Sequence, residues 1–270
     1  MLVDWLYTAP TWLSSIVIMV VALALSTGVL LIAHSIIGVE FRRQHNDLTG
    51  FVIAVVGVVY AVLLAFIAVV TWESYTRADE IAVEEANYAG NLYRDSVGLP
   101  EQIAGPLRTD LRAYVEDVIK EEWPLQRAGE APRTGWPMLE DMQIRIARFE
   151  PQTAGQTVVQ EEWLRTLNQL YGARRHRLLA SRGHVPAIGW WVIVLGGLVT
   201  IGCTYLFGAD RLPMQMILTA AVTAILTLNV ILIVQLDYPF RGAVSVSPEA
   251  YEAVLHSMDH AAAQLELSSP

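Results

Sequence analysis

Two pairs of adjacent glutamates and one pair of histidines are the side chains of this sequence best suited to chemistry. Glu84-Glu85 and Glu121-Glu122 offer neighbouring carboxylates, the groups that general acid–base catalysis uses. His256 and His260 stand one helical turn apart, a spacing that could place two imidazoles on one metal ion. Each pair also has a simpler structural explanation.

Adjacent residues on a helix point about 100° apart, which favours surface or inter-helix ion pairing of these glutamates over joint catalysis. The histidines have Asp259 between them but no third ligand nearby, and a solvated helix face accounts for them. The sequence contains no glycine-rich phosphate loop and no CxxC, HExxH or GxSxG motif. We therefore expect no enzyme activity, no metal site and no cofactor.

The glutamates lie in segments that the sequence predicts to be helical. Past Trp72 a helical period continues without a breaker until Gly98 and Pro100, so one long helix should contain Glu84-Glu85. A second amphipathic helix should end at Trp123-Pro124. The pattern then predicts a loop over 126–137 and helices over about 138–149, 156–182 and 248–267.

Four apolar stretches without Asp, Glu, Lys or Arg dominate the rest of the chain, in two pairs. Each has about the length that a helix needs to cross a bilayer core of roughly 30 Å, and none alternates as a barrel strand would. The stretches are Leu13–Ile37, Leu48–Trp72, Gly189–Phe207 and Leu212–Leu236. The sequence thus predicts an all-α membrane protein with four transmembrane helices in two hairpins.

These spans divide the chain into four parts. They are a first transmembrane hairpin (1–72), an inserted helical domain (73–185), a second transmembrane hairpin (186–236) and a tail with an amphipathic helix (237–270). More arginines flank the spans on the side of the domain and termini than in the short loops, so the positive-inside rule predicts that the domain and both termini are cytoplasmic. The net charge of −9 argues against a nucleic-acid partner.

The second span carries two distinct faces. One is a stripe of small residues that recurs every three or four positions and lets helices approach closely. It consists of Gly50, Ala54, Gly57, Ala61, Ala65 and Ala68. A bulkier apolar face, including Phe51, Val55 and Val59, runs beside the stripe. Plain helix packing explains this pattern, and so does a narrow apolar pore surrounded by copies of the helix in an oligomer.

Charged and polar residues continue from the spans. Glu73, Glu80 and Glu84 share one face of the long helix, with Arg77 between them. At a pore mouth such residues favour cations, but they could equally pair with arginines of neighbouring helices. Within the spans, we expect His34 to be hydrogen-bonded in the packing. We expect interhelical hydrogen bonds from a polar strip on the fourth span that consists of Thr219, Thr223, Thr227 and Asn229.

An ordered set of short motifs extends over nearly the whole chain. Around the second span it comprises Asn46, Gly50, Gly57, Tyr60–Phe66, Trp72 and Glu85-Ala86. Further on it comprises Tyr114, Glu122-Trp123 and the turn after the last span, with Asp237, Pro239, Phe240, Arg241 and Gly242. In this set the chain resembles uncharacterised bacterial bestrophin-like membrane proteins.

The resemblance implies a distant relation to bestrophins, which are pentameric anion channels with four spans per subunit and a hydrophobic neck on the second. It implies a homo-oligomer in the lipid bilayer of the bacterial inner membrane, with inorganic ions passing through it. Where bestrophins have an acidic calcium clasp after Pro-Phe-Gly, this chain has Ala243–Ser247, so we expect no calcium clasp. Within the turn, Asp237 and Arg241 could pair across Pro239.

The predicted function is therefore a homo-oligomeric ion channel with a neck formed by Phe51, Val55 and Val59. The alternative is a non-conducting membrane anchor or scaffold whose cytoplasmic helices bind a partner.

Overall fold

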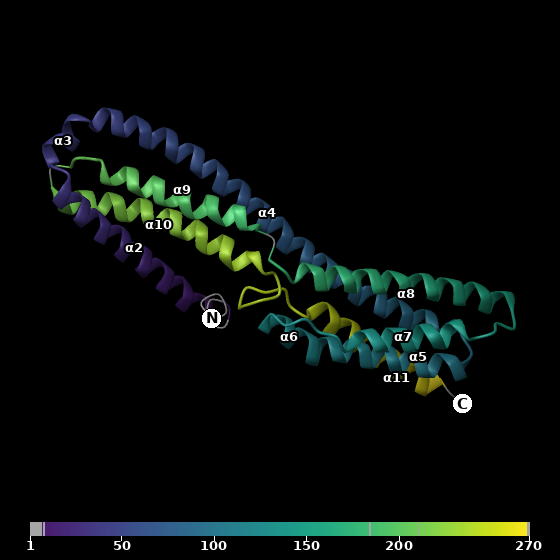
Figure 1. Cartoon of the computed structure of the whole chain (residues 1–270). Coiled ribbons are helices and arrows are strands. Elements are labelled where there is room, and N and C mark those ends of the chain that lie inside the picture. The colour runs from purple at the N-terminus through teal and green to yellow at the C-terminus, as the bar shows by residue number, and fades with distance from the viewer. Residues whose placement is uncertain (1–6, 8, 184, 210, 269–270) are drawn as a thin grey trace. The chain divides into compact units, whose positions relative to one another are not determined.

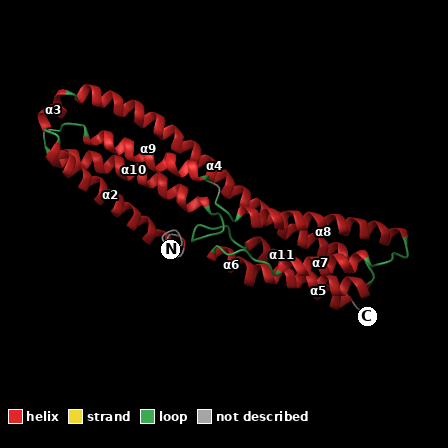
Figure 2. Ribbon diagram, in the orientation of Figure 1, coloured by secondary structure: helices red, strands yellow, loops and turns green. Residues whose placement is uncertain are grey.

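The computed structural model describes residues 7, 9–183, 185–209 and 211–268, and throughout this part of the chain the secondary structure is helical, with no strand (Figures 1 and 2). The chain forms two compact units. Unit 1 comprises residues 1–74, 183–238 and 242–244, and unit 2 comprises residues 75–182, 239–241 and 245–270. The long helix α4 begins in unit 1 and ends in unit 2.

Unit 1 contains four helices that are long and apolar enough to cross a membrane. They are α2 (Thr11–Ile36), the first part of α4 (Asn46–Asp95), α9 (Ala187–Tyr205) and α10 (Leu212–Asp237), and the short α3 (Val39–Gln44) connects α2 to α4. Helix α2 packs against α10 and α9, and α9 packs against α10 (Figure 1). The prediction of an all-helical chain with four helices of membrane-spanning length is confirmed.

Part of the polar strip on α10 lies inside this packing. The hydroxyls of Thr204 on α9 and Thr219 on α10 are 3.2 Å apart, so one donates to the other and confirms the expected interhelical bond. Thr223 is buried, but its hydroxyl has no hydrogen-bond partner among the described residues. Asn229 is half-buried and donates to the carbonyl of Ile225 in its own helix. Only part of the strip therefore joins helices within the chain.

Helix α4 meets α9 through Tyr60. Its hydroxyl donates to the carbonyl of Ile193 at 2.5 Å, and its ring lies against Gly196 and Gly197. A Cβ atom added at Gly196 would overlap the ring, so only glycine permits this approach. Tyr60 and Leu64 then form a small buried cluster with Ile193 and Ile233.

Unit 2 is built from helices that surround the second part of α4. They are η1 (Ser96–Gly98), α5 (Glu101–Asp117), η2 (Val118–Glu122), α6 (Trp123–Ala128), α7 (Gly135–Ala147), α8 (Ala154–Ala180) and α11 (Glu249–Ser268). The alanines of α4 at positions 78, 82, 86 and 89 are fully or almost fully buried, which lets neighbouring helices pack closely against it. The single helix α4 confirms the expected continuation of the second span past Trp72.

One predicted boundary is wrong. The helix expected to end at Trp123-Pro124 instead continues through the π-helical turn η2 into α6. Pro124 stands in the first turn of α6, where a missing N–H removes no bond that an α-helix requires. The chain leaves the helix only at Gly129, whose φ of 82° is favourable for glycine alone.

Residues that follow the last span complete the core of unit 2. Phe240, Val246 and Tyr251 are buried in the same apolar cluster as the helices of 75–182. Trp123 packs edge-on against the rings of Phe240 and Tyr251 and donates its Nε1–H to the carbonyl of Val246 at 3.1 Å. The tail of the chain is thus a structural part of unit 2.

Candidate functional site

The three residues singled out for a pore neck lie on the exposed side of α4 in unit 1. Phe51, Val55 and Val59 are 69%, 49% and 56% exposed. The opposite face of the helix is buried through Tyr60 and Leu64. At about 100° per residue, Phe51 falls on the side of the helix away from Tyr60. No helix in the described part of the chain therefore covers this apolar face.

The stripe of small residues is also largely uncovered. A Cβ added at Gly50 would have one atom within 4 Å, from Phe207 at 3.9 Å, and one added at Gly57 would have none. Ala54, Ala61 and Ala65 are exposed, and only Ala68 packs against the apolar cluster of unit 1. The close helix contact within the chain uses Gly196 and Gly197 of α9 instead, which the sequence analysis did not single out.

Each of the three acidic residues that follow along α4 is exposed. Glu73 belongs to unit 1, and Glu80 and Glu84 belong to unit 2. Their carboxylates form no ion pair among the described residues. Arg77 is likewise exposed.

The turn after the last span makes contacts in both units. In unit 1, Asp237 accepts a hydrogen bond from the backbone N–H of Val185 at 2.8 Å, and Gly242 adopts a φ of 80°. In unit 2, Arg241 donates to the carbonyl of Ala128 at 3.4 Å, and Phe240 is fully buried. The turn therefore fixes the backbone on either side of Pro239.

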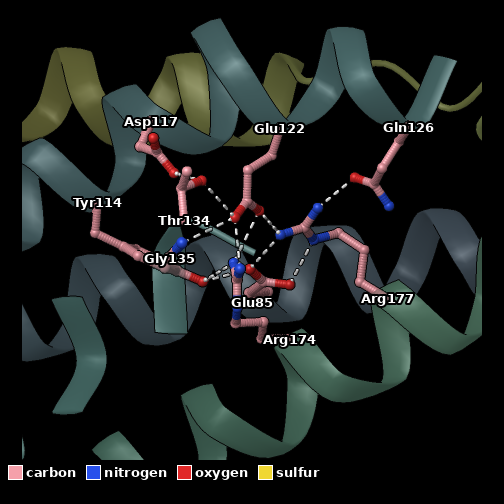
Figure 3. A network of polar contacts seen from close by, with 9 residues as sticks. All are labelled: Glu85, Tyr114, Asp117, Glu122, Gln126, Thr134, Gly135, Arg174 and Arg177. Atoms are coloured by element: carbon pink, nitrogen blue, oxygen red, sulfur yellow. Dashed lines mark hydrogen bonds and ion pairs between the residues drawn. The ribbon is translucent and has the colours of Figure 1, made fainter. Parts of the chain in front are cut away.

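The most polar site of the molecule is a buried network in unit 2 (Figure 3). Arg174 of α8 forms a two-pronged ion pair with Glu122 of η2, at 2.8 and 2.5 Å. Arg177, one turn further along α8, contacts Glu122 at 2.7 Å and Glu85 of α4 at 2.7 and 3.0 Å. All four side chains are completely buried. Two positive and two negative charges therefore compensate each other inside the unit.

Neutral groups form further hydrogen bonds with the charged side chains of this network. The hydroxyl of Tyr114 donates to Glu85 at 2.6 Å, and Gln126 accepts from Arg177. The backbone N–H of Gly135 donates to Glu122 at 3.2 Å. A Cβ at Gly135 would come within 2.6 Å of the guanidinium of Arg174, which explains the glycine there.

The environment of the network shifts its ionisation in the expected directions. Burial raises the pKa of Tyr114 well above its usual value, and the nearby charge of Glu85 raises it further. Burial alone would raise the pKa of Glu122, but hydrogen bonding from Arg174 and the charges of both arginines lower it below its usual value. Glu122 and its two arginine partners thus stay charged as ion pairs, an arrangement that holds helices together.

This network settles how the adjacent glutamates are used. Glu85 and Glu122 form inter-helix ion pairs, as predicted, while Glu84 and Glu121 are exposed. The arginine partners were not identified, because they lie 52 to 92 residues away in sequence.

The rings of the histidine pair lie close together. The rings of His256 and His260 lie 4.4 Å apart between centroids, and Asp259 pairs instead with Arg112 at 2.8 Å. No group of three His, Cys, Asp or Glu side chains able to hold a metal occurs among the described residues.

A third buried cation lies in unit 1, beside the loops that join its helices. The side chain of Arg42 on α3, between the first two spans, is only 1% exposed. It contacts His34 of α2 at 2.8 Å, and Gln215 of α10 and the carbonyl of Tyr205 at 3.3 Å each. His34 is therefore hydrogen-bonded within the packing, as expected.

These observations define an integral membrane protein with four helices that are long and apolar enough to span a membrane, and with a second helical unit fixed by buried ion pairs. The family model of the bestrophin-like domain matches residues 20–251. The chain therefore belongs to the bestrophin-like family, as its motifs indicated.

Solved structures agree in fold. Three crystal structures of a bacterial bestrophin homologue from Klebsiella pneumoniae, each with a single substitution, are similar to this chain. Their TM-scores are 0.64, 0.63 and 0.62 at 13%, 13% and 12% identity, and the matches cover 89%, 89% and 90% of this chain and 97%, 98% and 97% of theirs. No curated protein matches the sequence.

Proposed function

We propose that the chain is the subunit of a homo-oligomeric ion channel whose pathway follows α4. The observation that carries this proposal is the exposed apolar face of α4 with Phe51, Val55 and Val59, which no helix among the described residues covers. Copies of such a face around an axis would make a hydrophobic constriction, and such constrictions gate conduction by excluding water. Membership of the bestrophin-like family and the fold of the Klebsiella pneumoniae homologue support this assignment.

The largely uncovered stripe of small residues fits the same assembly. Small residues let helices of neighbouring subunits approach closely, and the open space beside Gly57 leaves room for one. Four spans cannot easily enclose a pathway alone, so the proposal requires several copies, five by analogy with bestrophins. Glu73, Glu80 and Glu84 would then line the approach to the neck and favour cations, unless arginines of neighbouring subunits neutralise them.

We further propose the arrangement of the chain in the bacterial inner membrane. The spans form two hairpins, 1–72 and 186–236, and the helical domain 73–185 and the tail 237–270 lie in the cytoplasm with both termini. The excess of arginine beside the spans on that side supports the orientation.

A non-conducting anchor is the competing proposal. In that case the exposed face of α4 would contact lipid or lie in closed helix contacts, and the helices of unit 2 would bind a partner.

Substitutions on α4 distinguish the two. We expect Val55→Ser and Val59→Ser to raise ion flux into liposomes, because a polar side chain lets water fill the constriction. Val194→Ser on α9 is the matched control, since Val194 is 50% exposed and Val55 is 49% exposed. It should leave flux unchanged.

The stripe is tested separately. Ala61→Leu should weaken assembly, measured by native mass, because the larger side chain separates helices at a close contact. If the Val55 and Val59 variants remain oligomeric and their flux stays at the level of empty liposomes, the channel proposal fails and the anchor replaces it.

A further inference from the structure

Arg42 holds a buried positive charge that no described carboxylate neutralises. Among the described residues, its guanidinium forms hydrogen bonds with the carbonyl of Tyr205, the amide oxygen of Gln215 and Nδ1 of His34. Its Nε has no hydrogen-bond partner among the described residues, which do not include Asp210. A buried guanidinium held by neutral acceptors alone depends strongly on each of them.

The contact with His34 specifies the protonation state of its imidazole. An arginine side chain has only donors, so Nδ1 of His34 must accept the 2.8 Å hydrogen bond from Nη2 of Arg42. The imidazole that accepts this bond carries no proton on Nδ1 and is neutral. A proton added there would place a donor against a donor and a second positive charge beside the first.

We propose that His34 and Arg42 form a pH-sensitive latch between α2 and α3. At neutral pH the imidazole of His34 holds the guanidinium of Arg42, and protonation of His34 on acidification breaks this contact and loosens α3. The latched state binds one proton fewer than the open state, so lower pH favours the open state.

The other ionisable groups of the surrounding elements do not offset the added charge. Helix α9 has no charged side chain, and its titratable groups are Cys203 and Tyr205. Apart from Arg42, the described charged side chains of α3, at the start of α4 and just before α10 are all exposed. They are Glu40, Arg43, Asp47 and Arg211. Protonated His34 would therefore meet a buried cation with no buried carboxylate from these elements to balance it.

Release of Arg42 would change how the start of α4 is held. Besides Arg42, a clasp of Asn46 with Gly208 holds this segment, with bonds of 2.9 and 2.8 Å to the backbone of the α9–α10 connection. Without the Arg42 contacts, α3 loses its side-chain hydrogen bonds to His34 of α2 and Gln215 of α10. The latch exists whether or not α4 lines an ion pathway, so it can be tested apart from flux.

Hydrogen–deuterium exchange of the full-length protein in liposomes tests the latch. The readout is the protection of backbone amides in residues 38–46, corrected for the intrinsic pH dependence of exchange, between about pH 8 and about pH 5. In the unmodified protein we expect protection to fall about tenfold or more, the size associated with losing a hydrogen bond to a charged group. His34→Gln keeps an acceptor and removes the titration, so its protection should not depend on pH.

His45→Gln provides the control, because His45 is exposed, lies next to α3 and contacts only the carbonyl of Phe41 among the described residues. This variant should keep the full pH response. The latch is refuted if the unmodified protein shows constant protection over this range, or if His34→Gln loses protection as the unmodified protein does.

Discussion

At the scale of single residues, Arg177 connects several helices of unit 2. It joins α8 to Glu85 of α4 and to Glu122 of η2 through ion pairs, and its guanidinium lies 5.4 Å from the ring centroid of Trp123. Removing it would leave buried carboxylates without their partner, a change that costs much more than the pair itself contributes.

We therefore expect Arg177→Met to lower the free energy of unfolding by about 3–5 kcal/mol. Arg165→Met is the control, because Arg165 pairs with Glu162 on an exposed part of the same helix. That change should cost less than about 1 kcal/mol. Chemical unfolding in detergent micelles measures both, and similar losses for the two variants would contradict the role of the network.

The same unfolding measurement should show an acid limit. The folded-state pKa of Glu122 lies below its usual value, so its ion pairs stabilise the fold above the unfolded-state pKa of about 4.3. This contribution is lost as the pH falls through the lower, folded-state value. The free energy of unfolding that Glu122 contributes should consequently not change with pH near neutrality, and it should be lost in strong acid.

Residue-scale predictions from the sequence succeed where the pattern is local. The divergence of adjacent helical positions correctly assigned Glu85 and Glu122 to ion pairing. The partners escaped prediction because tertiary folding alone brings α8 to them. The burial of Arg42 could not be predicted for the same reason, because its place in the sequence gives no sign that His34 and Gln215 will contact it.

At the scale of elements, the contact of α4 with α9 depends on a glycine. We expect Gly196→Ala to destabilise unit 1 by about 1–3 kcal/mol, because the added methyl overlaps the ring of Tyr60. Gly202→Ala in the same helix has no atom within 4 Å of the new Cβ and should be neutral or slightly stabilising. Thermal unfolding in detergent compares the two, and equal midpoints would show that the Tyr60 contact is not tight.

The ends of a helix could be predicted from the sequence where nearby residues determine them. The uninterrupted period after Trp72 correctly indicated one long α4. Pro124 was read as a terminator, but a π-helical turn places it at the start of α6, where proline is tolerated. The same turn positions Glu122 in the buried network, so tertiary contacts stabilise a geometry that propensity does not favour.

At the scale of the whole molecule, orientation in the membrane is the main prediction. Reporter domains fused after Pro270 and inserted near Ala131 should both report the cytoplasmic side, because arginines beside the spans are more numerous there. Fusions in the short connection near Arg211 should report the opposite side. An external signal from either of the first two positions would overturn the topology.

The chain-order of the unit 2 core has a consequence for biosynthesis. When the ribosome has completed α8, the apolar cluster still lacks Phe240, Val246, Tyr251 and Met258. These residues are translated only after α9 and α10, so both final spans must be synthesised before unit 2 can be completed. Until Phe240 and Tyr251 have been synthesised, unit 2 therefore remains incompletely packed, with one side of Trp123 uncovered.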